Sequence, residues 1–407
     1  MKSNDKVKQL HTFFLSPAYR NTQRPFPSMK KLLFLLFSAL TVACNNPGNN
    51  LPRHISETVL VSTVSNDNLL DTSEIEMEYV TSLKLPKDIQ SIASTKFTFE
   101  QDHFLIMDGK ANSCVLVFDS TGNFISRLGS RGRAKNEYVQ APTDYFVRAD
   151  KQVCVFERES RRVLTFSMSG ELTDMTRFKM FPYSLCVTDS NNYLCALNHK
   201  EAKDGLQLAL ISPDENILKG YLHLDGNYKY VTSDRTFFKC DDIIYHVPNL
   251  SDSILVFHED SITKVIRLSF DCDFVPDRIK KDIYKEDMDE YHGFKGIKTI
   301  MEYYETGKYI FIKYKKSILA LSTLIDKNTN KQYCFSSVPF EGLFPPCNLY
   351  VKDDKIYFLI TKEDVSLIKD SMSPDELKRN LRDTSSVVRN MFDNMYDFPL
   401  ILSVKIK

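Results

Sequence analysis

The chain has 407 residues, of which 43% are hydrophobic, close to the globular average of about 45%, and this excludes global disorder. Its 53 basic and 53 acidic side chains balance, which excludes a nucleic-acid binder that works through bulk positive charge. At about 150 residues per domain the length predicts two or three domains, although all-β folds often run longer as one unit.

Residues 29–43 have the pattern of a secretory signal peptide. Met29-Lys30-Lys31 precedes an uncharged run from Leu32 to Ala43, and a charged start before a short apolar run is typical of export signals. The run is too short to span a bilayer, which needs about 20 residues. A buried core helix is the alternative. We interpret residues 1–28 as a misassigned upstream leader and Met29 as the true start.

Cys44 directly follows this run. The stretch from Leu40 to Cys44 resembles a bacterial lipobox, in which the Cys becomes the lipid-modified first residue of the mature protein. Thr41 stands where that pattern has an aliphatic residue, so ordinary signal-peptidase cleavage is the alternative. We expect a lipidated Cys44 and a polar tether over residues 44–74. Without an acidic run after Cys44, we favour the periplasmic face of the outer membrane, with surface exposure as the alternative.

The lipid, and not charge, is expected to hold the protein to the membrane. Residues 1–43 contain seven basic side chains and one acidic side chain, so the remainder of the chain has a small net negative charge. An acidic body is not attracted to anionic lipid.

From residue 75 onward, short β-rich runs alternate with turns. The runs Lys96–Phe99, Phe104–Met107, Cys114–Phe118 and Phe124–Leu128 form one set of four, and a second set follows over residues 145–178. The turns recur at the interval of about 40–50 residues that a four-stranded propeller blade takes. One interval between successive turns is longer than the others and predicts an insertion around residues 271–296.

The pattern therefore predicts an all-β chain, with a six-bladed β-propeller of four-stranded antiparallel blades over residues 75–407. The last set of runs lacks a fourth strand, and we expect Glu76–Leu85 to close this blade beside Pro399–Ile406. A stack of β-sandwiches is the alternative. Two small helical insertions are predicted, at Pro276–Tyr291 and from Ser373 toward Met395.

Eight cysteines follow Cys44, and none forms a CxxC motif. Most lie in apolar runs, which predicts buried free thiols. A disulfide between Cys186 and Cys195 across a hairpin is the alternative.

The run from Val115 to Gly122, continuing through Gly129-Ser130-Arg131-Gly132 to Glu137-Tyr138, resembles the six-bladed β-propeller lipoproteins of Bacteroidales. Asp252-Ser253-Ile254 and the ending Phe398–Ile401 are similar to the same family. The chain departs from the family pattern at residues 133–136, where that pattern has Gly-Pro-Gly. The resemblance covers about residues 75–407 and implies this fold in an envelope lipoprotein, but no established reaction.

The chain contains no phosphate loop, GxSxG elbow or HExxH motif, and its eight His are scattered. We expect no metal site and no cofactor. If distant His meet at a propeller axis, His103, His199 and His246 are the ones to inspect.

The candidate ligand-binding residues cluster in one loop and the strand after it. These residues are Arg127, Arg131, Arg133, Lys135, Asp144 and Tyr145. The four cations could receive an anionic ligand. The alternative is a solvated loop between blades whose charges only keep the protein soluble.

Together these features favour a binding or scaffold module of the cell envelope, attached to the membrane, with a glycan, peptide or protein partner and no nucleic acid. The absence of Trp makes a sugar-stacking platform less favourable. The alternative is a propeller-type envelope enzyme, a lyase or hydrolase, with its site at the central channel.

Overall fold

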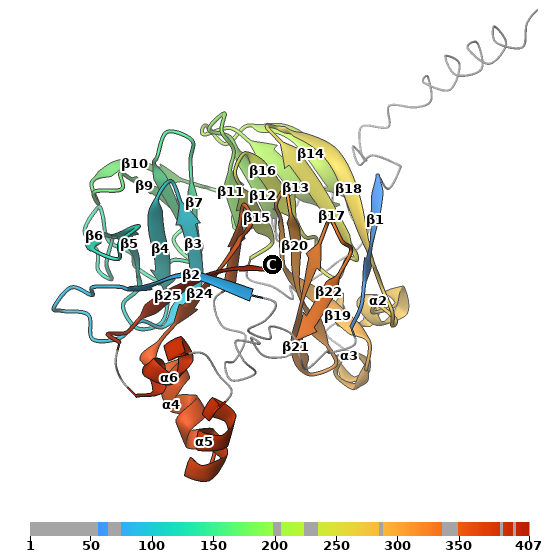
Figure 1. Cartoon of the computed structure of the whole chain (residues 1–407). Coiled ribbons are helices and arrows are strands. Elements are labelled where there is room, and N and C mark those ends of the chain that lie inside the picture. The colour runs from blue at the N-terminus through green and yellow to red at the C-terminus, as the bar shows by residue number, and fades with distance from the viewer. Residues whose placement is uncertain are drawn as a thin grey trace, which may run out of the picture. The chain divides into compact units, whose positions relative to one another are not determined.

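The computed structural model describes residues 56–63, 75–197, 205–223, 235–284, 288–335, 349–382, 386–393 and 396–406. These residues form six small sheets arranged as a β-propeller (Figure 1), each with four antiparallel strands, which confirms the predicted fold. The predicted leader, signal peptide and Cys44 lie outside the described residues.

Four blades are built from strands that follow one another along the chain. Blade 1 contains β3 (Ser94–Glu100), β4 (His103–Asp108), β5 (Cys114–Asp119) and β6 (Phe124–Leu128). Blade 2 contains β7 (Asp144–Val147), β8 (Val153–Glu157), β9 (Arg162–Phe166) and β10 (Leu172–Arg177). Blade 3 contains β11 (Pro182–Val187), β12 (Tyr193–Leu197), β13 (Leu206–Ile211) and β14 (Ile217–His223). Blade 5 contains β19 (Ile297–Glu305), β20 (Tyr309–Lys316), β21 (Leu319–Asp326) and β22 (Gln332–Phe335).

Burial within a blade explains why these sequences form strands. The middle strand β5 is apolar and buried from Cys114 to Phe118, because both faces of a blade pack against neighbouring blades. The outermost strand β10 is half-exposed and carries polar residues. Continuous apolar runs therefore mark the middle of each blade, and mixed sequences mark its rim.

Blade 6 joins the two ends of the propeller sequence. It contains β2 (Ile75–Ser82), β25 (Leu400–Ile406), β24 (Lys355–Ile360) and β23 (Leu349–Lys352), in that order across the sheet. β2 runs antiparallel to β25, with Ser82 opposite Leu400. The predicted closure by an N-terminal strand is confirmed.

Blade 4 has a fifth strand that the sequence analysis assigned to the tether. Its strands are β15 (Phe237–Cys240), β16 (Ile243–His246), β17 (Ser253–His258), β18 (Ser261–Phe270) and, parallel to β18 at the edge, β1 (Glu57–Val61) (Figure 1). In β1, Val59 and Val61 are buried and Leu60 between them is exposed. This alternation is that of a half-buried strand, so residues 56–63 belong to the propeller.

Helices occur in two insertions, as predicted, but differ in detail. The first holds two short helices, α2 (Asp277–Tyr284) and α3 (Asp289–Gly293), in place of the single helix expected over residues 276–291. The second holds α4 (Lys362–Ser371), α5 (Pro374–Arg382) and α6 (Ser386–Phe392), between β24 and β25. α4 was not predicted, although Thr361 and Asp364 form a capping box at its start. Among the described helices, none has the length and apolarity to cross a bilayer.

The seven cysteines of the described residues are all free thiols, and every one except Cys272 is buried. The prediction of buried thiols is confirmed, and the alternative of a Cys186–Cys195 disulfide is wrong for this structure.

Candidate functional site

The axis of the propeller is lined by the innermost strands β3, β7, β11, β15, β19 and β23, here called the first strands of their blades. Neighbouring first strands contact each other, as β7 does β11 and β15 does β19. Each first strand leads through a hairpin into the second strand of its blade, so the hairpins gather at one end of the axis, here called the hairpin end. The connections from the preceding blade arrive at the opposite end, here called the connection end.

A small cavity lies between the first strands of blades 1, 2, 4 and 5. Its volume is about 30 Å³, enough for one or two water molecules or part of a small ligand. Its walls are formed by Lys96, Thr98, Glu100, Tyr145, Phe146, Val147, Phe238, Lys239, Asp241 and Tyr304. Glu100 and Asp241 stand where their strands enter hairpins, so the cavity extends toward the hairpin end.

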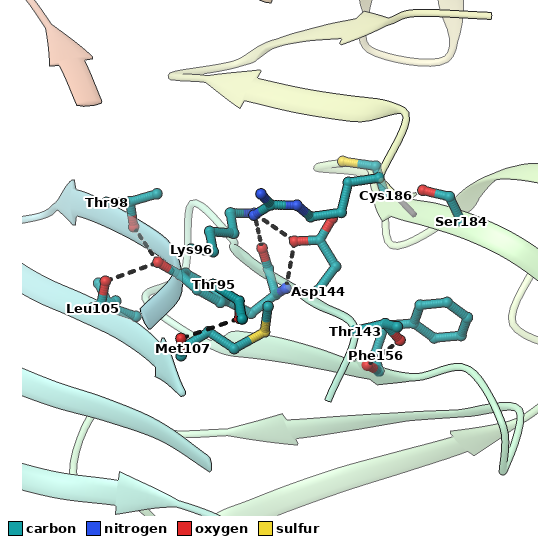
Figure 2. Close-up of polar contacts among 12 residues, drawn as sticks. Thr95, Lys96, Thr98, Leu105, Met107, Thr143, Asp144, Phe156, Ser184 and Cys186 are labelled. Carbon is teal, nitrogen blue, oxygen red and sulfur yellow. Dashed lines mark hydrogen bonds and ion pairs between the residues drawn. The ribbon is translucent and has the colours of Figure 1, made fainter. Parts of the chain in front are cut away.

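Lys96 is the innermost charged group of this cavity. Its Nζ donates to Asp144 Oδ1 at 2.7 Å (Figure 2). It also donates to the carbonyl oxygen of Tyr145 at 2.5 Å. The same ammonium lies 4.5 Å from the ring centroid of Tyr145 and 4.3 Å from that of Phe146. Burial lowers the pKa of Lys96. The negative charge of Asp144 raises this pKa, and the positive charge of Arg235 lowers it further, so that the net shift is downward. An ammonium has three donors, so one N–H of Lys96 is left for another acceptor.

More charge surrounds the axis toward the connection end. Arg235 lies 3.8 Å from Glu302, and Lys313 lies 3.3 Å from the same carboxylate. Burial opposes the charge of Arg235, but Asp144 and Glu302 raise its pKa above the ordinary value. Lys96, Arg235 and Lys313 thus lie close to the carboxylates of Asp144 and Glu302 around the axis.

Two tyrosines supply hydroxyl groups at the cavity. Tyr145 Oη donates its hydrogen to the Leu105 carbonyl oxygen at 2.9 Å. The Thr98 hydroxyl, also 2.9 Å from Tyr145 Oη, is therefore the donor in their mutual hydrogen bond. Tyr304 is buried, and its hydroxyl forms no hydrogen bond with another described residue. Burial raises the pKa of both phenols well above 10, so both stay protonated and Tyr304 remains a donor.

A second group of charged side chains lies at the hairpin end. Lys352 Nζ lies 3.0 Å from Glu100 Oε2 and 3.9 Å from Asp241 Oδ1, and Glu100 also accepts from Tyr350 Oη at 2.5 Å. Lys239 is paired with Asp189 at 2.7 Å. Three carboxylates thus face two ammonium groups, and Asp241, whose side chain is 65% exposed, is the most loosely paired of them.

The structure separates the residues that the sequence analysis grouped as a binding site. Asp144 and Tyr145 open the innermost strand β7, as predicted, and lie at the axis. Arg127 is on the outermost strand β6, paired with Asp88 at 2.5 Å. The remaining three, Arg131, Arg133 and Lys135, are exposed in the connection from β6 to β7 and do not line the cavity.

The connection from β6 to β7 is tied down beside blade 2. Tyr138 is fully buried and donates to the Leu128 carbonyl oxygen at 2.9 Å. Arg162 Nη2 donates both to the Glu137 carbonyl oxygen and to the buried carboxylate of Glu157. This connection approaches β7 at its Asp144 end, which is the connection end, whereas Asp241 marks the hairpin end.

The sequence analysis did not predict most residues of the cavity wall, although the sequence of β3 contains a pattern that indicates three of them. Lys96, Thr98 and Glu100 alternate with Phe97 and Phe99. Residues at every second position share one face of a strand, so three polar side chains in an innermost strand point together toward the axis.

The described residues contain no group of three or more His, Cys, Asp or Glu side chains placed to hold a metal ion. His246 is buried against Phe237, while His103 lies at a hairpin with its Nδ1 2.6 Å from the Gln101 carbonyl oxygen. His199 lies outside the described residues.

The family model of a domain of unknown function, DUF4934, matches residues 57–390. The chain belongs to the DUF4934 family. The match begins at the first residue of β1, in agreement with the assignment of that strand to the propeller. No curated protein matches this DUF4934 chain.

Solved structures similar to this DUF4934 chain have low sequence identity to it. A Bacteroides fragilis protein described as exported has 17% identity and a TM-score of 0.70, over 86% of this chain and 99% of that one. A member of the DUF4221 family from Bacteroides vulgatus has 9% identity and a TM-score of 0.43, over 82% and 98%. A virginiamycin B lyase from Staphylococcus aureus has 10% identity and a TM-score of 0.43, over 82% and 100%. At 17% identity, the likeness to the Bacteroides fragilis protein shows the fold alone.

Proposed function

We propose that this DUF4934 chain is an exported, lipid-anchored binding module of the cell envelope whose ligand occupies the axial cavity. The observation that carries the proposal is the cavity wall. It offers an ammonium with one N–H to spare, a phenol donor and a loosely paired carboxylate, at Lys96, Tyr304 and Asp241 respectively. Polar groups that converge in a concave, partly aromatic site can fix the orientation of a ligand group.

The sequence before the propeller supports export and anchoring. Met29-Lys30-Lys31, the apolar run to Ala43 and the following Cys44 have the order of a lipoprotein signal. The chain reaches the first propeller strand, β1, at Glu57. A short segment between Cys44 and Glu57 would keep the propeller close to the bilayer. We place the propeller at the periplasmic face of the outer membrane.

Binding fits the axis better than the alternative of a lyase or hydrolase does. A general base needs a free lone pair, whereas the Lys96 ammonium donates to Asp144 and to the Tyr145 carbonyl. Asp144 Oδ1 accepts from Lys96 and from the Tyr145 N–H. Its Oδ2 is buried without a hydrogen-bond partner among the described residues, but Asp144 is not among the residues that line the cavity. Groups held in this way are suited to orienting a ligand.

The anchor is tested by fractionation of cells that express the full chain. Cys44→Ser should move the protein from the membrane fraction to the soluble envelope fraction. Cys272→Ser, which changes a half-buried thiol of the propeller, is the control and should stay with the membranes. A Cys44→Ser protein that still pellets with membranes would contradict the anchor.

The binding role is tested by a thermal-shift screen with anionic, cationic, dipolar and neutral small molecules. A ligand at 100 times its dissociation constant adds about 2.7 kcal/mol to the free energy of unfolding. Tyr304→Phe should remove a hit at the axis, whereas Arg131→Ala with Arg133→Ala should leave it. Hits that depend on the two arginines and not on Tyr304 would move the site to the β6–β7 connection.

A further inference from the structure

Two large apolar side chains are exposed next to each other at the turn between β20 and β21. Lys316 at the end of β20 is paired with Leu319 at the start of β21, so Ser317 and Ile318 form a two-residue loop. Ile318 is 80% exposed and Leu319 is 56% exposed. Isolated apolar residues are ordinary on a protein surface, whereas an adjacent pair at a hairpin tip points to a contact outside the chain. Residues 317–319 are here called the β20–β21 tip.

The β20–β21 tip lies at the connection end of the propeller. The first strand of blade 5, β19, begins at this end, and β20 returns to it antiparallel to β19. The helices α2 and α3 precede β19 at the same end (Figure 1). Just before β19, the Gly296 carbonyl oxygen accepts from Ser317 N at 3.0 Å. The tip is therefore fixed against the insertion between blades 4 and 5.

Three lysines without ion pairs lie beside the tip. Lys295 is exposed and directly precedes Gly296, while Lys315 lies half-buried in β20. Lys298 is buried in β19, and its Nζ donates to the His292 carbonyl oxygen at 3.0 Å. Among the described residues, none of the three lysines has a carboxylate within ion-pair distance. Burial lowers the pKa of Lys298, and the charges of Lys315 and Lys295 lower it further, so the three ammonium groups are close enough to repel one another.

We propose that the β20–β21 tip enters the surface of an anionic phospholipid bilayer, with its apolar pair at the acyl boundary and Lys295 and Lys315 at the headgroups. Apolar side chains flanked by lysines match the two layers of such a surface, because the acyl chains accept the first and the phosphates attract the second. The attraction is local, since the whole chain has equal numbers of basic and acidic side chains. This contact lies outside the axial cavity and goes beyond the proposed function.

The small size of the tip favours a bilayer over a protein partner. A stable protein interface buries about 800 Å² on each side, which takes roughly 20–30 residues. Ile318 and Leu319 offer only two neighbouring apolar side chains. A bilayer needs no matching surface, so a pair of side chains can enter it. Because two side chains bury less apolar area than one acyl chain, the tip would orient the protein and would not hold it alone.

The segment before β1 is long enough to bring a lipid on Cys44 to the same bilayer. β1 is parallel to β18, which ends at the connection end. Just beyond β1, Thr63 Oγ1 accepts from Lys316 Nζ, next to the tip, at 2.7 Å. From Glu57 to Thr63 the chain covers roughly 20 Å at about 3.3 Å per residue. The 13 residue steps from Cys44 to Glu57 span at most roughly 45 Å, so the anchor of the proposed function and the tip can contact one surface.

Contact at the tip would turn the hairpin end of the axis away from the bilayer. The axial cavity extends toward that end, where Glu100 and Asp241 stand. A ligand would then reach the cavity from the aqueous side. The tip thus supplies an orientation that a lipid attached at one point does not.

The absence of Trp from the chain allows one introduced Trp to report on its own surroundings. Ile318→Trp places the probe at the tip, and Ile217→Trp is the matched control at a 54% exposed position of blade 3. Each full-length variant, with Cys44 retained or changed to Ser, is mixed with vesicles of phosphatidylethanolamine and phosphatidylglycerol. The emission of Ile318→Trp should move to shorter wavelength and be quenched by brominated phosphatidylglycerol, whereas that of Ile217→Trp should do neither.

A pair of substitutions tests the role of the lysines. Lys295→Gln with Lys315→Gln, added to Ile318→Trp, should raise the lipid concentration for half of the shift at least about tenfold, since each lysine near an anionic surface contributes roughly fivefold. The control is Lys151→Gln with Lys219→Gln, which removes the same charge from exposed positions of blades 2 and 3. An equal effect of the two pairs would overturn the assignment of the lysines to the headgroups.

The outcomes keep this inference separate from the proposed function. If Ile318→Trp emits and is quenched like Ile217→Trp in both Cys44 forms, the tip does not enter lipid and the inference is wrong, whatever holds the protein to the membrane. If Ile318→Trp enters the vesicles equally well in both forms while fractionation shows no anchor, the inference stands and the anchor is wrong. Neither outcome depends on the ligand of the axial cavity.

Discussion

Cys186 and Cys195 lie on neighbouring strands of blade 3 but point to opposite faces of the sheet. Cys195 is paired with Leu185, and Cys186 with Leu194, so the two cysteines are one residue out of register. A shift of one residue in an antiparallel pair reverses the face on which a side chain lies. Cys186 accordingly belongs to the hydrophobic cluster that includes Phe237 of blade 4, and Cys195 to the cluster that includes Phe156 of blade 2.

This register predicts that the fold does not depend on redox conditions. The melting temperature of the full chain should be the same with and without a reductant. Burial raises the pKa of both thiols, which disfavours the reactive thiolate. After denaturation without reductant, iodoacetamide should modify both cysteines, as mass spectrometry of the peptides would show. Unmodified, linked peptides would contradict the register.

Closure by β2 predicts an all-or-none loss of folding. Glu78 of β2 is held by Lys355 of β24 at 2.8 Å and by Lys405 of β25 at 2.9 Å. Deleting residues 76–85 removes the outermost strand of blade 6 and exposes the edge of β25. We expect the thermal transition followed by circular dichroism to lose its cooperativity. Retention of the parental transition by this variant would rule out closure as a requirement for the ring.

The contacts of β1 predict that part of the N-terminal segment is structural. Ser62 N donates to Gln332 Oε1 at 2.8 Å, and Thr63 N donates to Asp271 Oδ2 at 2.9 Å, so the end of β1 links blades 4 and 5. Deleting residues 45–63 should lower the melting temperature by several degrees, as a loss of a few kcal/mol does. Deleting only residues 45–55 is the control and should change it little. Equal melting temperatures for the two deletions would show that β1 adds no stability.

The buried carboxylate of Glu157 predicts a large loss of stability from a single conservative substitution. Its side chain is fully buried and accepts from Arg162 Nη2 at 2.5 Å, from Gln140 N at 2.7 Å and from Ser160 Oγ at 2.8 Å. Glu157→Gln removes the charge that balances Arg162, so the free energy of unfolding should fall by about 3 kcal/mol. Urea denaturation measures this change. Glu171→Gln, at an exposed turn, is the control, and an equal effect of both changes would refute the assignment.

His246 predicts a specific dependence of stability on pH. Burial lowers its pKa from 6.5 to about 3, so the folded state keeps it neutral where the unfolded state protonates it. Its contribution to stability therefore decreases as pH falls from about 6.5 toward 3, by about 2 kcal/mol at pH 5. His246→Phe should flatten the difference between urea midpoints at pH 7 and pH 5. Parallel pH profiles for the two proteins would contradict the burial effect.

The blades could be predicted because their signal is local. Apolar runs such as Val115–Phe118 and the turns between them fix strand positions, and the missing fourth strand of the last blade leaves β2 as the natural candidate. Position along the chain also placed Asp144 and Tyr145 correctly in an innermost strand, since they open the run after a blade-to-blade connection.

The cavity could be predicted only in part, because it depends on which ends of distant strands meet. The cluster of Arg131, Arg133 and Lys135 is conspicuous in sequence, but charge on a connection does not say which end of the axis it reaches. Asp241 and Tyr304 come from different blades, and each is unremarkable among its sequence neighbours. The register that separates Cys186 from Cys195 is set by the turn between β11 and β12, where Thr188 N donates to the Asn192 carbonyl oxygen and three residues, not two, connect the paired positions.

The pairing of β2 with β25 also sets the time at which this molecule can finish folding. A chain that emerges in order from a ribosome or a translocation pore presents β2 early, and five blades must follow before residues 400–406 arrive to cover it. Pairings across such a long stretch of chain form slowly. Until then, the waiting strand is an open edge that another chain could join. Completion of the ring is therefore a late event, reached only after the last blade has left the machinery that makes or exports it.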